Sequence, residues 1–182
     1  MKLYHSCETR PVLGSHDLFD GFLFFSGYHQ TTRGALVLTT EVADADIVDV
    51  EDVLNHEADG NMRELVAEAR SIIKRQHGIE ITVDQAEDLI TQRIAYEVGF
   101  TDGLVDRDDF DSFEDFDIER QALRMDFEFD SETGWKLQML GARAARIAGF
   151  RGVNLSDEMG RSVAVWMQGH EAELVEAEAE AA

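Results

Sequence analysis

Three short segments, far apart along the chain, carry side chains that could take part in binding or catalysis. They are His5 followed by the small Ser6, the aromatic run GFLFFSG at 21–27, and the acidic pair Asp157 and Glu158. A ring nitrogen of imidazole can donate or accept a hydrogen bond, and an aromatic face can stack on a planar ligand. A fixed carboxylate can stabilise positive charge as it develops. If the fold brings the three together, they form a cleft across which a dinucleotide could lie.

Strands are predicted for the segments that hold these residues. KLYHSC at 2–7 alternates apolar and polar residues from Leu3 to His5 and predicts a short strand, and the glycine-bounded apolar run at 21–27 predicts a second, buried strand. GVNL at 152–155 and SVAVWM at 162–167 are typical of two short strands. The turn SDEMGR, built on Gly160, would join them.

Helices are predicted for three other segments, and we expect them to support the site rather than to form it. The first runs from Asp44 to His77, with Gly78 as its cap, and its apolar residues recur at helical spacing: Met62, Leu65, Val66, Ala69, Ile72 and Ile73. The second covers about 82–97, where Thr82 and Gln85 resemble a capping box and one stripe holds Ala86, Leu89, Ile90 and Ile94. The third starts with a cap at Ser131, stops at Gly149 and carries Trp135, Leu137, Leu140, Ala144 and Ile147.

Two segments are strongly acidic. Residues 101–130 hold twelve carboxylates and three arginines, which indicates a mobile insertion or an acidic docking surface, with a solvated loop favoured. DRDDFDSFEDFD within it lacks the central glycine of a calcium loop, so a calcium site is disfavoured. We expect residues 1–169 to form a single domain and residues 170–182 to form a frayed helix or a disordered acidic tail.

Composition limits the classes of function. The 182 residues are 44% hydrophobic, enough for one core, and the single cysteine, Cys7, excludes an internal disulfide and a cysteine-rich zinc site. A net charge of −22 argues against direct binding to nucleic acid and suits a solvated acidic face or a basic protein partner. With neither an apolar leader nor a long apolar run, we expect a soluble, cytoplasmic protein without membrane association.

Four segments together resemble the ADP-ribosyltransferases of phages that act as anti-CRISPR inhibitors. They are YHS at 4–6, GFLFFSG at 21–27, GWKLQMLGARAARIAGF at 134–150 and VNLSDEMG at 153–160. The resemblance covers the two ends of the chain well and the middle poorly. It implies a small α+β, split-sheet ADP-ribosyltransferase-like fold, NAD as co-substrate, and evasion of host defence by modifying a type I CRISPR effector (Cascade) subunit.

The resemblance also implies which residues bind NAD. His5 would help to anchor a ribose, with Tyr4 beside it, and the small Ser6 would leave room for the backbone to pair with the nicotinamide amide. An aromatic residue followed by a serine would stack on nicotinamide, and the candidates for this second element are Phe24, Phe25 and Ser26, with Tyr28 as an alternative ring.

The catalytic carboxylate implied by the resemblance is Asp157, with Glu158 as the neighbouring alternative. Loss of nicotinamide leaves an oxocarbenium-like ribose, which a nearby carboxylate can stabilise. The toxin-like transferases that modify arginine have two glutamates one residue apart, whereas Asp157 and Glu158 are adjacent in this chain. Side chains at adjacent strand positions face opposite ways. Arginine specificity is therefore not supported, and the acceptor residue stays open.

Two other functions compete with this enzyme. The acidic surface could imitate DNA and block a basic groove by occupancy, without NAD and at one inhibitor per target. Alternatively, the chain could be a bacterial toxin that ADP-ribosylates a housekeeping protein of its host.

Overall fold

The computed structural model shows a mixed α+β protein made of two compact units. It describes residues 1–14, 19–27, 36–56, 61–78, 80–92, 94–95, 105–106, 131–157 and 160–177. Unit 1 comprises Met1–Asp49 and Gly149–Ala182, and unit 2 comprises Val50–Ala148. The α+β class is thus confirmed. The predicted boundaries, 1–169 for one domain and 170–182 for a tail, differ from those of the two units and stay a prediction.

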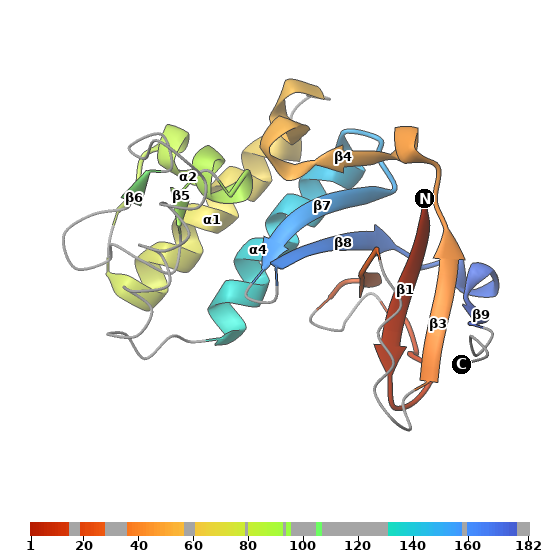
Figure 1. The fold of residues 1–182 in the computed structure, drawn as a ribbon. Coiled ribbons are helices and arrows are strands. Elements are labelled where there is room, and N and C mark those ends of the chain that lie inside the picture. Colours follow the sequence, from red (N-terminus) through yellow and green to blue (C-terminus); the bar gives the residue numbers. More distant parts are fainter. Residues whose placement is uncertain are drawn as a thin grey trace. The chain divides into compact units, whose positions relative to one another are not determined.

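The first sheet of unit 1 has three antiparallel strands in the order β1-β3-β9 (Figure 1). They are β1 (Lys2–Cys7), β3 (Leu36–Glu41) and β9 (Val175–Glu176). β1 pairs with β3 along its whole length, from Lys2 opposite Glu41 to Cys7 opposite Leu36. β9 pairs only with Leu38 and Thr39, so the end of β3 near Glu41 extends beyond it.

The second sheet of unit 1 has the order β2-β8-β7-β4. Its strands are β2 (Phe22–Phe25), β4 (Ile47–Asp49), β7 (Gly152–Asp157) and β8 (Gly160–Trp166). β4 and β7 are parallel, and the other neighbours are antiparallel. Gly21 immediately precedes β2 and has a φ of 81°, and its carbonyl oxygen accepts hydrogen bonds from the N–H groups of Met167 and Gln168 at 2.9 and 3.2 Å.

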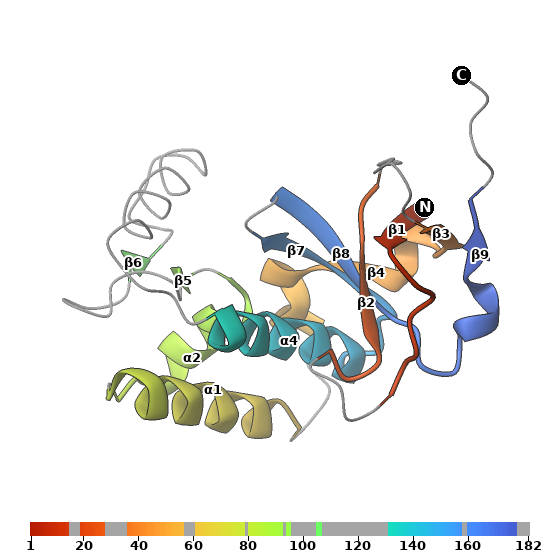
Figure 2. The same ribbon diagram turned by 90° about the horizontal axis from the view of Figure 1, so that it is seen from below.

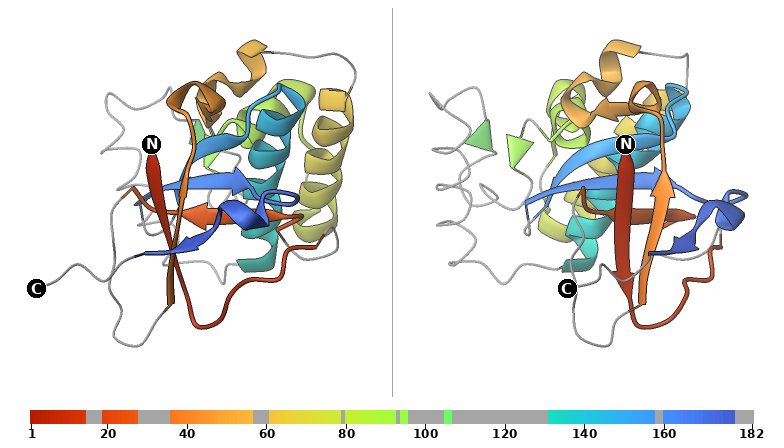
Figure 3. Two further views of the ribbon diagram at one scale, coloured as in Figure 1. Left: turned by 90° about the vertical axis from the view of Figure 1, so that its right-hand side faces the viewer. Right: turned by 45° about the vertical axis from the view of Figure 1, so that its right-hand side comes forward.

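The core of unit 1 lies between these two sheets. β1 and β3 run across the direction of β2 and β8, as both views of Figure 3 show. Side chains from both sheets and from the C-terminal segment form one buried cluster: Leu3, Leu23, Phe25, Leu38, Val42, Val163, Val165, Met167 and Leu174. Burial of this apolar surface holds together strands that are far apart in the sequence.

Unit 2 is mainly helical (Figure 2). It contains the 3-10 helix η2 (Val50–His56), the helices α1 (Asn61–His77), α2 (Val83–Ile90) and α4 (Ser131–Ile147), and the two-stranded pair β5 (Ile94–Ala95) and β6 (Val105–Asp106). α1 packs against α2 and α4. Arg143 Nη1 of α4 lies 2.8 Å from Glu68 Oε2 of α1.

Many of the predicted elements are confirmed. β1, β2 and the β7–β8 hairpin occupy the predicted segments, and the six apolar residues predicted for α1 are all buried. Gly78 and Gly149 adopt φ angles of 72° and 94° just beyond α1 and α4. The capping box at the start of α2 has both reciprocal hydrogen bonds, between Thr82 and Gln85. These signals are local, because each depends only on residues close together in the sequence, and they can therefore be predicted from it.

The prediction of a helix from Asp44 onward is wrong for residues 44–56. A short 3-10 helix η1 (Asp44–Asp46) precedes β4, and η2 follows it. The cause is a remote partner: Ile47 and Val48 pair with Gly152 and Val153 of β7, which favours the extended backbone preferred by β-branched residues.

The predicted second helix is too long. α2 ends at Ile90, because Gln92 takes a left-handed φ of 58° and the Thr91 hydroxyl lies within hydrogen-bond distance of the backbone carbonyls of Glu87 and Asp88. Ile94 then belongs to β5 rather than to the helical stripe.

The C-terminal segment is folded as far as residue 177, contrary to the expected frayed helix or disordered tail. It forms the 3-10 helix η4 (Glu171–Glu173) and β9, and Leu174 between them is buried. Residues 178–182 lie outside the described residues, as do 101–104 and 107–130 of the acidic segment. The solvated loop and the calcium hypothesis therefore stay predictions.

Candidate functional site

Two of the three predicted site segments meet where β1 passes the end of β2. Tyr4 and Ser26 exchange both backbone hydrogen bonds at 2.9 Å, although 22 positions separate them. The Ser26 hydroxyl also lies 3.5 Å from the Tyr4 carbonyl oxygen. This pairing joins the two sheets of unit 1 at one point, which we call the β1–β2 junction, defined by Tyr4, His5, Phe24 and Ser26.

The His5 ring has a defined orientation at this junction. Its Nδ1 lies 2.7 Å from the carbonyl oxygen of Phe24. Because a carbonyl oxygen only accepts, Nδ1 must carry the proton, and in the neutral ring Nε2 is then an acceptor. The ring centroid lies 5.7 Å from that of Phe25, and the side chain is half-buried. His5 is therefore held on one side and presents a hydrogen-bond acceptor on the other.

Tyr4 and Ser6 direct their side chains to the opposite face of β1 from His5, because side chains alternate along a strand. Lys2 and Tyr4 share that outer face, where the Lys2 Nζ lies 5.6 Å from the centre of the Tyr4 ring. Tyr4 thus contributes to the junction through its backbone, whereas His5 contributes its ring.

The two predicted phenylalanines differ in burial. Phe25 is 2% exposed within the core between the sheets, so its ring is occupied by packing. Phe24 is half-buried and meets the Phe19 ring edge-on, with 5.6 Å between centroids. Phe24 is therefore the better placed of the pair to offer a ring face to a ligand. Tyr28 lies outside the described residues.

The third segment reaches the same end of the second sheet as the β1–β2 junction. Phe25 is level with Val163 of β8, and Asp157, the last residue of β7, pairs with Gly160 at the beginning of β8. From standard strand spacings, Asp157 lies about 10 Å from Phe25 along the strands and about 10 Å across them. Glu158 lies outside the described residues, and of Asp157 only the backbone position is described.

Cys7, the only cysteine, also lies on β1 and is suited to packing rather than attack. Its Sγ lies 3.7 Å from the Leu36 carbonyl oxygen. Burial raises the pKa of the Cys7 thiol, and the positive charge of Arg10 only partly opposes this. Since the thiolate is the nucleophilic form, Cys7 stays a thiol at neutral pH and is no competitor to the predicted site.

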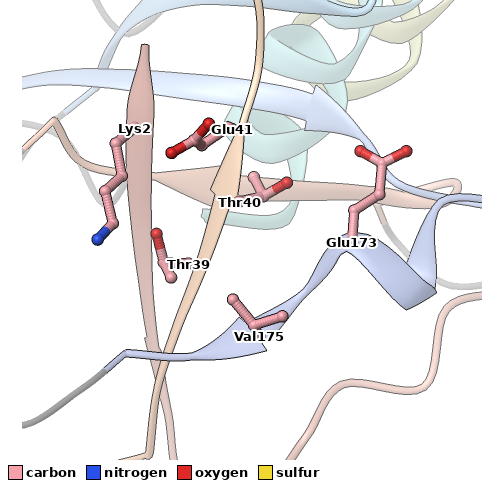
Figure 4. A pocket seen from close by; sticks show the side chains of 6 residues that line it. All are labelled: Lys2, Thr39, Thr40, Glu41, Glu173 and Val175. Carbon is pink, nitrogen blue, oxygen red and sulfur yellow. The ribbon is translucent and has the colours of Figure 1, made fainter.

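A pocket that sequence reasoning missed lies on the first sheet (Figure 4). Its volume is about 320 Å³, and its lining consists of Lys2, Thr39, Thr40, Glu41, Glu173 and Val175. None of these residues was predicted as a site residue. No signal in the sequence could have found the pocket, because it depends on β9 ending partway along β3.

Within the described residues, no three His, Cys, Asp or Glu side chains cluster as metal ligands. None of the described helices is long and apolar enough to cross a membrane. Comparison of the sequence with protein-family models and with curated proteins finds no match.

Proposed function

We propose that this chain is an NAD-dependent mono-ADP-ribosyltransferase with an ADP-ribosyltransferase-like fold, which modifies a subunit of a type I CRISPR effector and so inhibits recognition of target DNA. The observation that carries the proposal is the paired backbone of Tyr4 and Ser26. It joins the strand-one histidine to the Phe-Phe-Ser segment, two elements that the resemblance of the sequence assigns to one NAD site.

The proposed hold on NAD uses both the ring of His5 and the backbone of Ser6. With Nδ1 donating to Phe24, the His5 Nε2 would accept a hydrogen bond from a ribose hydroxyl. In an antiparallel ladder the backbone groups of alternate residues point to the same side. Those of Ser6 therefore point to the side on which Tyr4 pairs with Ser26, and an amide such as nicotinamide carries the matching donor and acceptor.

The proposed reaction breaks the bond between the ribose C1′ and the nicotinamide nitrogen. The bonding electron pair leaves with nicotinamide, and the positive charge that develops on the ribose would be stabilised by the carboxylate of Asp157. A nucleophilic side chain of the partner protein then bonds to C1′ and releases its proton. The position of Asp157 at the junction end of the second sheet supports this role.

The main alternative, an acidic mimic of DNA, is favoured by the net charge of −22. The two functions differ in stoichiometry and in their need for NAD, because covalent modification works at substoichiometric amounts. We would titrate the chain against a purified type I effector with and without NAD, and search the effector subunits for ADP-ribose by mass spectrometry.

The enzyme predicts inhibition well below one chain per effector, only with NAD, together with an ADP-ribose adduct on one subunit. NAD-independent inhibition at equal molar ratio, without an adduct, would refute the enzyme and support mimicry. Growth arrest of a CRISPR-free host on expression, abolished by Asp157→Asn, would instead indicate a toxin that modifies a housekeeping protein.

A further inference from the structure

The residues proposed to bind NAD include no group for its phosphates. They offer a neutral ring nitrogen of His5, aromatic rings and backbone groups, none of which carries a positive charge. NAD has two negatively charged phosphates, and a single CH2 group joins the nicotinamide ribose to them. The net charge of −22 opposes the approach of such an anion. A cation close to His5 would offset this repulsion.

Unit 1 holds few cations for this role. Its described Lys and Arg side chains are those of Lys2, Arg10, Arg151 and Arg161, and Arg33 lies outside the described residues. Lys2 is on the outer face of β1, where its Nζ lies 5.6 Å from the centre of the Tyr4 ring. Because side chains alternate along a strand, this is the face opposite to that of the His5 ring.

Arg10 and Arg151 are engaged by the C-terminal segment. Arg10 Nη2 donates to the carbonyl oxygen of Leu174, and Arg151 Nη2 lies 2.6 Å from Glu173 Oε2. Either arginine would have to leave its partner in order to bind a phosphate. Among the described residues of unit 1, Arg161 is thus the cation left for this role.

The side chain of Arg161 shares a face of the second sheet with the residues beside His5. Residues two apart on a strand point the same way, so Arg161 and Val163 lie on one face of β8. Val163 pairs with Phe25, and both belong to the buried cluster between the sheets. The His5 ring lies 5.7 Å from the Phe25 ring. From standard strand spacing, Arg161 lies about 7 Å beyond Val163 along β8.

Arg161 is available to an anion and is close to the proposed catalytic residue. It is exposed and forms no ion pair with any residue that the structure describes. Its backbone lies opposite Ser156, next to the pair formed by Asp157 and Gly160. The guanidinium group can donate to two phosphate oxygens at once, which makes arginine well suited to a diphosphate.

We propose that Arg161 binds the diphosphate of NAD and thereby holds the nicotinamide ribose against His5. This inference rests on the proposed function, because it adds a residue to the same site. The two groups follow the order of the ligand, with the ribose at His5 and the diphosphate further along β8 at Arg161. Since the bond that breaks is on the ribose, Arg161 binds the substrate and takes no part in bond breaking.

The test compares ligands with and without phosphates by calorimetry on the full chain. NAD and ADP-ribose carry the diphosphate, whereas nicotinamide riboside has the same nicotinamide and ribose without it. Arg161→Gln should weaken binding of NAD and ADP-ribose about 10- to 100-fold, as expected for a lost hydrogen-bonded charge. The affinity for nicotinamide riboside and the melting temperature should be unchanged, because Arg161 is exposed.

Three further variants separate the guanidinium fork from charge alone. Arg161→Lys keeps the charge without the fork and should recover only part of the affinity. Lys2→Gln removes one positive charge from the outer face of β1, and it should change the NAD affinity less than about twofold at about 0.15 M salt, where distant exposed charges are screened. Arg33→Gln tests the cation of unit 1 that lies outside the described residues.

The outcomes distinguish failure of this inference from failure of the proposed function. Equal NAD affinity of the wild type and Arg161→Gln, or a loss in Arg33→Gln only, would overturn the role of Arg161 and leave the NAD site standing. A similar weakening of nicotinamide riboside in Arg161→Gln would also overturn phosphate binding. Absence of NAD and ADP-ribose binding by the wild type would instead refute the proposed function, and this inference with it.

Discussion

The two units of this protein are organised in opposite ways. In unit 2 the ends of the helices are set by nearby residues, such as the Thr82 and Gln85 capping box and Gly78. In unit 1 most strands pair with partners more than a hundred positions away, as β2 does with β8 and β4 with β7. Of the segments with predicted chemistry, the first two meet through the pairing of Tyr4 with Ser26, 22 positions apart, whereas Asp157 is connected to them through the remote pairing of β2 with β8. The comparison teaches that nearby residues define the elements of the helical unit, whereas remote pairing assembles the strand unit, which carries the proposed chemistry.

Ile73→Ala is the strongest test of the stabilising role of unit 2. Ile73 is fully buried in α1, and truncation of such a residue costs about 2–5 kcal/mol in the free energy of unfolding. Urea denaturation measures this loss, and the exposed Arg63→Ala on the same helix should change stability by less than about 0.5 kcal/mol. Equal losses in the two variants would contradict a packed helical core.

Asp157→Asn tests the chemical role of unit 1. We expect the transfer rate to fall about 10²–10³-fold, because the variant lacks the charge that stabilises the transition state. The melting temperature should be unchanged. Glu158→Gln is the matched control, and it should retain most of the activity. The reverse result would assign the catalytic role to Glu158.

His5→Asn separates binding from folding at the β1–β2 junction. The asparagine Nδ2 can still donate to the Phe24 carbonyl, as His5 Nδ1 does, but the acceptor Nε2 is lost. The affinity for NAD should fall about tenfold by calorimetry, as expected for one lost hydrogen bond. Unchanged affinity with unchanged stability would remove His5 from the proposed site.

Thr82→Ala sharpens the claim that local signals build unit 2. The variant lacks the side chain that accepts the Gln85 N–H at 3.1 Å, which should lower stability by about 1 kcal/mol. Thr82→Ser keeps the hydroxyl and should retain most of it. A loss with serine as large as with alanine would show that the methyl group, rather than the cap, matters.

Glu173→Gln gives the smallest effect and depends on pH. Hydrogen bonds from His170 and Arg151 lower the pKa of the Glu173 carboxyl below its usual value. Its contribution is therefore present above about pH 4.3 and is lost as the pH falls through the lower folded-state pKa. With the side chain 43% exposed, it should not exceed about 1 kcal/mol.

Melting temperatures of the wild type and Glu173→Gln should therefore differ at pH 7 and converge once the pH falls below the lowered pKa of Glu173. Glu176→Gln, on the neighbouring exposed strand β9, makes the same charge change without these partners. A difference that persists at low pH would show that the ionised carboxylate is not the stabilising form.

Local patterns predicted much of the fold, and remote pairing explains the failures. Helical spacing located α1 and α4, alternation located β1, and an apolar run bounded by glycines located β2. The segment 44–56 and the C-terminal residues 170–177 were misassigned because β4 and β9 exist only through pairing with β7 and β3. Of the candidate site, the residue types could be read from the sequence. The tautomer of His5, the burial of Phe25 and the pocket beside Thr40 could not.

The Gly21 carbonyl, which accepts two backbone hydrogen bonds, affects which sequence changes unit 1 can accommodate. A side chain at this position would place its Cβ 2.8 Å from the Cβ of Gln168, so only glycine fits there. Gly21 therefore fixes the register of β2 against β8 at the start of β2, whereas Ser26 lies at its other end. Since a slip by one residue would reverse every side chain of β2, the alignment of Ser26 with Tyr4 is secured independently of the chain between β2 and β3. Insertions between these two strands should therefore leave the pairing of Ser26 with Tyr4 intact.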